Sequence, residues 1–105
     1  MQALPALREA GDVLRVIKTY YNLAELSLRE GKYEEALSLA EKALGLNGDD
    51  AEANFVKGIC YAKYMNRMQE GIPYLERAVS LAPTNGYWME DLAVAYGMSG
   101  QIRKT

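Results

Sequence analysis

The chain has 105 residues, half of them hydrophobic, and a net charge of −2 from 14 acidic and 12 basic side chains. This length is typical of one domain, and the apolar content argues against disorder. The balanced charge provides no basic stripe of the kind that binds nucleic acid. Histidine is absent, which removes Ser-His and Cys-His catalysis and nearly all zinc chemistry. We therefore expect no enzyme, no metal and no cofactor.

No apolar run approaches 18 residues, so we expect no membrane span. The first residues show no basic segment followed by a long apolar one, and the expected location is therefore cytoplasmic. Cys60 is the single cysteine, which excludes an internal disulfide framework. We expect Cys60 to be a small buried core residue rather than a reactive thiol.

The first residues admit two interpretations. Pro5 could open a short helical turn over residues 4–10 that breaks at Gly11 and Asp12, with Asp12 capping the next helix. Alternatively, one helix runs from Pro5 to Glu30.

The rest of the chain is predicted to be helical, because apolar residues recur at spacings of three and four and strand-like alternation is absent. Gly31 suits a position just past a helix C-terminus. Loops 47–50 and 82–85 carry Asp or Asn, which cap free amides at helix starts. The pattern predicts helices over residues 13–30, 33–46, 51–65, 69–82 and 86–99.

The chain also repeats itself at offsets of 34 or 35 residues: Ala24 recurs as Gly58 and then as Ala93. Such a period indicates one helical unit copied and stacked. Pro73 fits the first turn of a helix, where its missing N–H has no partner. We therefore expect that helix to start near residue 69 or 70, after a turn one residue longer than in the first unit. Gly71 indicates either close helix contact or tolerance near a helix start.

These residues resemble the tetratricopeptide repeat family, whose 34-residue units are helix–turn–helix pairs. The matching residues of unit one are Tyr20, Leu23-Ala24, Ser27, Gly31-Lys32-Tyr33-Glu34-Glu35-Ala36 and Ala43-Leu44. Unit two matches at Gly58, Tyr61, Gly71, Ala78 and Pro83, but departs from the family pattern at Asn54 and Lys57. Unit three matches at Met89, Leu92-Ala93, Tyr96 and Gly100.

The resemblance implies an all-α fold of helix–turn–helix repeats in a short right-handed solenoid. We divide the chain into an N-terminal extension of the first helix (1–16), repeat one (17–50), repeat two (51–85) and the first helix of an incomplete repeat three (86–105).

The resemblance also implies that the first helix of each unit lines a concave groove. Phe55 lies outside the core pattern of its helix, and a large apolar residue there suggests a contact patch. The alternative is that some of these residues pack between adjacent units. The predicted groove residues are Tyr21, Glu25, Phe55, Ile59, Tyr87, Glu90, Asp91 and Val94.

A family subtype grips a C-terminal carboxylate with Lys, Asn and Arg side chains. The matching positions here are Tyr21, Glu25, Val56, Tyr87 and Asp91. None of them fits, so a carboxylate clamp is not expected. The acidic rim favours basic or neutral apolar peptides instead.

The third unit has no room for a second helix before Thr105. Met89, Leu92, Ala93 and Tyr96 would be covered by that helix, so we expect them to be exposed. Repeat arrays normally end in a polar cap. Two outcomes follow from this exposure, a frayed last helix or pairing with a second copy. We expect pairing through Met89, Leu92 and Tyr96, giving a homodimer.

The predicted function is a protein–protein interaction scaffold that binds a peptide or partner helix in its groove. Two alternatives remain open at this point. One is a substrate-presenting repeat fragment of a larger enzyme of the glycosyltransferase or sulfotransferase type, and the other is a self-assembling structural module.

Overall fold

The computed structural model describes the backbone of residues 3–99 and the side chains of residues 11–97. Over these residues the chain is helical, without strands. The elements are α1 (Ala3–Arg29), α2 (Tyr33–Leu46), α3 (Ala51–Ile59), the π-helix η1 (Cys60–Tyr64), α4 (Met68–Leu81) and α5 (Gly86–Ser99). The predicted helices 33–46 and 86–99 have the observed bounds. The N-terminal alternative of one long helix is confirmed, because α1 continues through Gly11 and Asp12.

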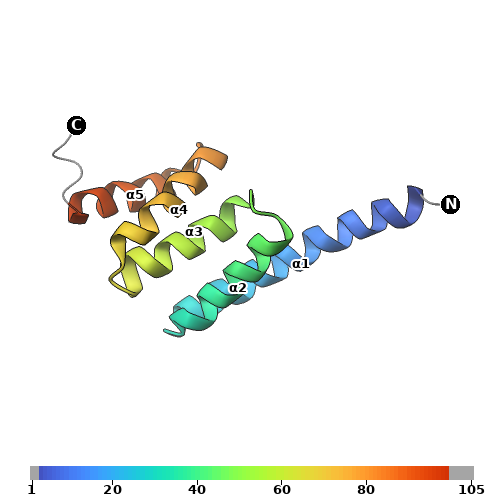
Figure 1. The fold of residues 1–105 in the computed structure, drawn as a ribbon, viewed down its shortest axis with the longest axis horizontal. Helices are drawn as coiled ribbons and strands as arrows, with labels where there is room; N and C mark the ends of the chain where they lie inside the picture. The colour runs from blue at the N-terminus through green and yellow to red at the C-terminus, as the bar shows by residue number, and fades with distance from the viewer. Residues whose placement is uncertain (1–2, 100–105) are drawn as a thin grey trace.

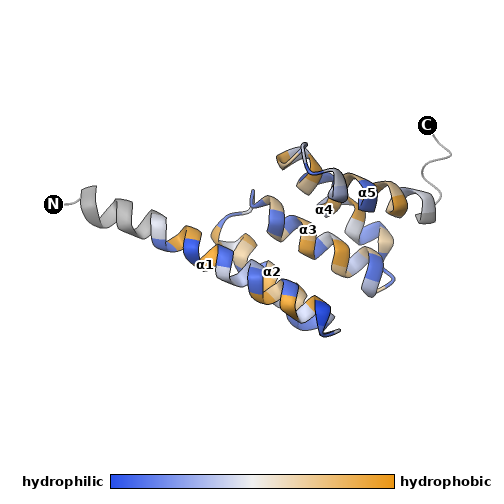
Figure 2. Ribbon diagram, turned by 180° about the vertical axis from the view of Figure 1, so that it is seen from behind, coloured by the Kyte–Doolittle hydropathy of each residue, from blue (hydrophilic) through white to orange (hydrophobic). Residues whose placement is uncertain are grey.

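The helices form two hairpins and a further single helix (Figure 1). α1 packs on α2, α3 packs on α4, and α5 packs on α4, while α2 contacts α3 and joins the two hairpins. α1 extends past α2 at its N-terminal end (Figure 1). Hydrophobic and hydrophilic residues alternate along α1 and α3 (Figure 2), as expected for helices with one buried face.

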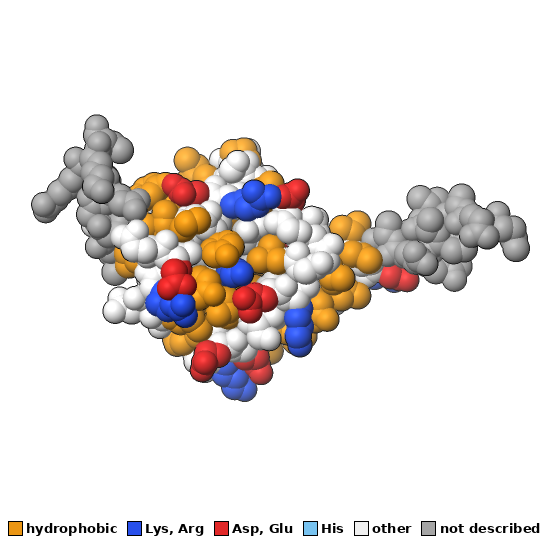
Figure 3. All heavy atoms as spheres, in the orientation of Figure 1, with side chains coloured by type: hydrophobic (Ala, Val, Ile, Leu, Met, Phe, Trp, Pro, Cys, Tyr) orange, Lys and Arg blue, Asp and Glu red, His pale blue; other side chains and the backbone are white. Residues whose placement is uncertain are grey.

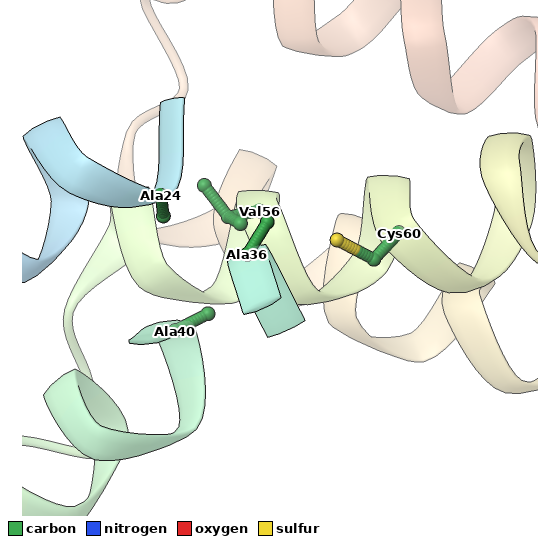
Figure 4. Close-up of a cluster of buried hydrophobic side chains, with 5 residues drawn as sticks. All are labelled: Ala24, Ala36, Ala40, Val56 and Cys60. Atoms are coloured by element: carbon green, nitrogen blue, oxygen red, sulfur yellow. The ribbon is translucent and has the colours of Figure 1, made fainter. Parts of the chain in front are cut away.

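The core is built mainly from small side chains. Ala24 of α1 and Ala36 and Ala40 of α2 are buried together with Val56 and Cys60 (Figure 4). Small residues allow helix backbones to approach closely while interiors stay densely packed. The prediction that Cys60 is a buried core residue is confirmed, since its exposed fraction is 0%.

The second hairpin closes even more tightly, at two glycines. A Cβ atom placed on Gly58 would lie 2.8 Å from Cγ of Leu75. A Cβ atom placed on Gly71 would lie 2.5 Å from the backbone oxygen of Gly58. Of the two interpretations of Gly71, close helix contact is therefore the observed one.

The extra residue of the second repeat lies inside a helix and not in the turn. The connections between the paired helices are equally long, residues 30–32 and residues 65–67. Their left-handed residues, Gly31 (φ 79°) and Asn66 (φ 56°), are 35 positions apart. The additional residue is accommodated in η1, where the Met65 N–H donates to the oxygen of Cys60 at 2.8 Å. The prediction of a longer turn is wrong, because a π-turn accommodates one extra residue without changing the helix ends.

Pro73 is also placed differently from the prediction. α4 begins at Met68, so Pro73 is its sixth residue and lies beyond the first turn. Proline there lacks the N–H for one helical hydrogen bond, and its ring is tolerated on the exposed side of α4.

Two departures of the second repeat from the family pattern have structural roles. Asn54 is buried, and its side-chain amide donates to the backbone oxygens of Gly48 (3.1 Å) and Asp50 (2.9 Å). Lys57 reaches Glu41 of α2 at 3.4 Å and lies 4.5 Å from the ring centre of Tyr74. Both residues therefore tie α3 to neighbouring segments.

The predicted helix starts are capped as expected. Asp50 accepts a hydrogen bond from the N–H of Ala53 at 2.9 Å, and Asn85 accepts one from the N–H of Trp88 at 3.2 Å. Each cap satisfies an N–H that has no partner within its helix.

Candidate functional site

A pocket of 260 Å³ lies on the face predicted to form the groove. Two of the predicted groove residues on α5, Asp91 and Val94, line it together with Ile59 of α3. η1 contributes Ala62 and Lys63, and the remaining lining residues are Leu75 of α4 and Ala95 of α5. Three helices and the π-helix thus meet at one hollow, and five of its seven lining residues are apolar.

Most residues that line the pocket belong to the hydrophobic core. Ile59, Ala62, Leu75 and Ala95 are all buried members of one hydrophobic cluster. By contrast, Val94 is 59% exposed and lies at the mouth. A buried apolar floor with an exposed apolar rim suits the insertion of a partner side chain.

The charged residues that line this pocket are Lys63 and Asp91, and Glu90 precedes Asp91 on α5. The pKa of Asp91 is raised, chiefly by burial. Glu90 raises it further and Lys63 opposes the shift. A second cation that approached Asp91 would oppose the raised pKa as Lys63 does, because an opposite charge favours the charged carboxylate.

Two other predicted groove residues, Tyr21 and Glu25, lie together on α1. The Tyr21 hydroxyl is hydrogen-bonded to Glu25, and the pKa of Tyr21 is raised by burial first and by this hydrogen bond second. Lys18 of α1 lies 5.3 Å from the Tyr21 ring centre and 3.5 Å from the Glu52 carboxylate of α3. This pair of contacts forms a polar edge where α1 meets α3.

Phe55 packs between repeats rather than standing free as a contact patch. Its ring stacks on Trp88 with centroids 4.8 Å apart and an interplanar angle of 12°. Phe55 also packs against both hydrophobic clusters of the repeats. Ile59 is buried, at 6% exposure, in a cluster with Ala95 of α5, and it also lines the pocket. The alternative interpretation, packing between adjacent units, therefore holds for Phe55, while Ile59 both packs between units and contributes to the pocket.

Trp88 is the residue that the sequence analysis overlooked. It is 8% exposed and supplies the partner of Phe55, which links α3 to α5. Its only signal in the sequence is that it is the single tryptophan, directly preceded by Tyr87. Tyr87 itself is 80% exposed at the start of α5, next to the acidic pair Glu90 and Asp91 in the following turn.

The three residues predicted for self-association are not equally exposed. Met89 is 50% exposed. Leu92 and Tyr96 are half-buried and pack against the cluster of Ile72 and Leu75 on α4. The Tyr96 hydroxyl also donates to Glu76, and this bond, together with burial and the charge of Glu76, raises the pKa of Tyr96 to about 12. The expectation that Leu92 and Tyr96 are exposed is wrong, because α4 already covers one side of them.

A larger hollow of 620 Å³ lies at the turn end of the hairpins. Tyr33 stacks there on Tyr64 at 4.2 Å, and the Arg67 guanidinium is paired with Glu70. Three of the four charged residues that line this hollow already have partners: Arg67 pairs with Glu70, Lys32 with Glu30, and Glu35 accepts from Ser27. The smaller pocket at Val94 is mainly apolar by contrast.

Among the described side chains, those of residues 11–97, no group of three or more Cys, Asp or Glu is arranged to hold a metal ion. Within the same described part, no helix is long and apolar enough to cross a membrane. On the face shown in Figure 3, acidic and basic side chains are interspersed and hydrophobic atoms are exposed between them.

The tetratricopeptide repeat profile matches residues 21–86, which include both hairpins from Tyr21 onward. This chain belongs to the tetratricopeptide repeat family. The helical architecture agrees with this membership and with the expected solenoid of helix–turn–helix repeats.

The tetratricopeptide repeats of this chain are similar to those of anaphase-promoting complex subunit 7 from Homo sapiens and from Mus musculus. In each comparison 36% of 73 aligned residues are identical. The alignment covers 70% of this chain but 13% of each relative. Family membership indicates a repeat scaffold of the kind used for protein–protein interaction.

Proposed function

We propose that this repeat domain binds a peptide or partner helix against the face formed by α1, α3 and α5. The observation that carries the proposal is the 260 Å³ pocket, whose lining includes Ile59, Asp91 and Val94 of the predicted groove. An amphipathic helix or an extended segment placed across such a face gains affinity from apolar side chains inserted in pockets.

The relatives support an architectural role. They are named as subunits of a complex, and a repeat that joins a larger assembly needs exposed contact surfaces. Tyr87 and Val94 provide exposed apolar surface on α5, at 80% and 59%. Polar groups on α1 and α3, including Glu25 and Glu52, would line the remaining path of a bound segment.

A displayed random peptide library selected on the immobilised chain tests this proposal. Val94→Asp should reduce binding of the selected pool at least tenfold, because it puts a carboxylate at an apolar pocket mouth beside Asp91. Val16→Asp is the matched control. Val16 is also an exposed valine (42%), and it lies about 140° around α1 from Tyr21.

The control should bind as the unmodified chain does. Circular dichroism should show unchanged helix content in both variants. Equal binding by the Val94 and Val16 variants would contradict the proposed groove.

A second candidate function is self-association through α5. The observation that favours it is that Tyr87, Met89 and Val94 are all at least half exposed on this one helix. Met89→Glu should shift a dimer toward monomer in sedimentation equilibrium. Met89 is preferred to Leu92 or Tyr96, since a charge at those half-buried positions would also weaken α5 packing. A monomeric unmodified chain at high concentration would refute this second function.

A further inference from the structure

The pocket between η1 and α5 has the size and lining of a receptor for one apolar side chain. Its 260 Å³ corresponds to about nine water volumes at roughly 30 Å³ each. Water in a hollow walled by Ile59, Leu75 and Ala95 finds few hydrogen-bond partners. An apolar group that displaces such water gains affinity.

The extra residue of the second repeat contributes directly to this pocket. Ala62 and Lys63, both pocket-lining residues, belong to the π-helix that accommodates it. η1 is pressed against α4, since a Cβ atom on Gly71 would lie 2.7 Å from the backbone nitrogen of Ala62. π-turns of this kind are often found at functional sites.

The charges beside the pocket favour a positively charged neighbour of the inserted side chain. The titratable residues that line it are Lys63 on η1 and Asp91 on α5, and Glu90 acts on the charge of Asp91. Glu76 of α4 follows the lining residue Leu75 in the chain. Glu76 accepts the hydrogen bond of Tyr96, so its carboxylate is already engaged. Asp91 and its neighbour Glu90 then outnumber the single Lys63, so the local excess of charge is negative.

We propose that this pocket is a socket for one leucine- or phenylalanine-sized side chain of a partner segment, with a Lys or Arg of that segment pairing with Asp91 and Glu90. The proposal rests on the proposed groove and specifies the chemistry of its occupant. The partner is thus a basic amphipathic peptide or helix, with the cation about one helical turn from the apolar anchor.

The test uses the same random peptide library and one protein variant that fills the socket. Ala95→Leu adds bulk from a wall residue and should abolish enrichment of peptides with the apolar-plus-basic pattern. Ala93→Leu is the matched control, since Ala93 is exposed and lies about 160° around α5 from Ala95. The control should enrich the same peptides as the unmodified chain.

The most enriched peptide is then synthesised and titrated by fluorescence anisotropy. Replacing its apolar anchor by Ala should weaken binding at least about tenfold, or about 1.4 kcal/mol. Replacing its basic residue by Glu should weaken binding to the unmodified chain more than binding to Asp91→Asn. These peptide changes leave the protein intact, so they remain decisive even if Ala95→Leu fails to fold.

The experiment distinguishes a failure of the proposed socket from a failure of the proposed groove. Enriched peptides that are sensitive to Val94→Asp but insensitive to loss of their anchor overturn the socket and leave the groove. Absence of any enriched peptide overturns the proposed function itself.

Discussion

Replacing Gly71 by Ala tests the close crossing of α3 and α4. The added methyl would lie 2.5 Å from the Gly58 oxygen, 2.7 Å from the Ala62 nitrogen and 2.8 Å from the Ala62 Cβ. Two of these three atoms are backbone, so a rotamer change cannot relieve the clash. The hairpin must open by some tenths of an ångström along its whole crossing.

The expected magnitude follows from two opposing effects. Alanine is favoured over glycine within a helix by about 1 kcal/mol. Overpacking of a dense core costs about 1–3 kcal/mol, and backbone contacts of this kind belong at the upper end. We expect a net loss of about 1–2 kcal/mol, which lowers Tm by roughly 4–16 °C for a domain of this size.

Gly45→Ala is the matched control, because a Cβ atom on Gly45 of α2 meets nothing within 4 Å. It should leave stability unchanged or raise it by up to about 1 kcal/mol. Thermal and urea unfolding followed by circular dichroism measure both variants. A Gly71→Ala variant as stable as Gly45→Ala would refute the close crossing.

Three further predictions concern the core. Gly58→Leu should lower the free energy of unfolding in urea by a few kcal/mol, since its Cβ alone would lie 2.9 Å from the backbone nitrogen of Leu75. An unchanged urea midpoint would disprove that contact. Phe55→Ala should lower the free energy of unfolding by about 2–3 kcal/mol, because it removes the ring that stacks on Trp88. This loss is smaller than for a fully buried Phe, since Phe55 is partly buried. A loss below about 0.5 kcal/mol would show that the stack contributes little. Burial raises the pKa of the Cys60 thiol from 9.0 to about 11, so the folded state keeps its proton longer and stability should fall as pH rises from about 9 to 11. Cys60→Ala should reduce that fall. An identical dependence of stability on pH in both chains would show that the buried Cys60 thiol does not cause it.

The bounds of α2 and α5 and the caps of α3 and α5 were readable from the sequence. Asp50 and Asn85 have side chains that accept from free amides two or three residues later, and the structure uses both in this way. The small residues Ala24, Ala36 and Gly58 lie where the helices cross. These features depend on local chemistry and on the 34-residue period, both of which are written in the order of residues.

The candidate site was only partly predictable. Asp91 and Val94 do lie on one pocket with Ile59, as expected for neighbouring first helices. The roles of Phe55 and Trp88 were not apparent, because their stacking joins residues 33 positions apart and depends on how α5 is oriented against α3. Periodicity within one helix shows which side is apolar, but it does not show which apolar side chain meets a neighbouring repeat.

The sequence by itself determined the helical repeat, its caps and its small crossing residues, since each follows from spacing and side-chain size. Only the tertiary structure decided that α1 is continuous through Gly11 and that η1 accommodates the extra residue of the second repeat. It also decided that α4 half covers Leu92 and Tyr96. In each of these cases several local conformations were compatible with the residues. Packing against another helix selected one of them, since it determines which apolar surface is buried and which backbone groups find partners.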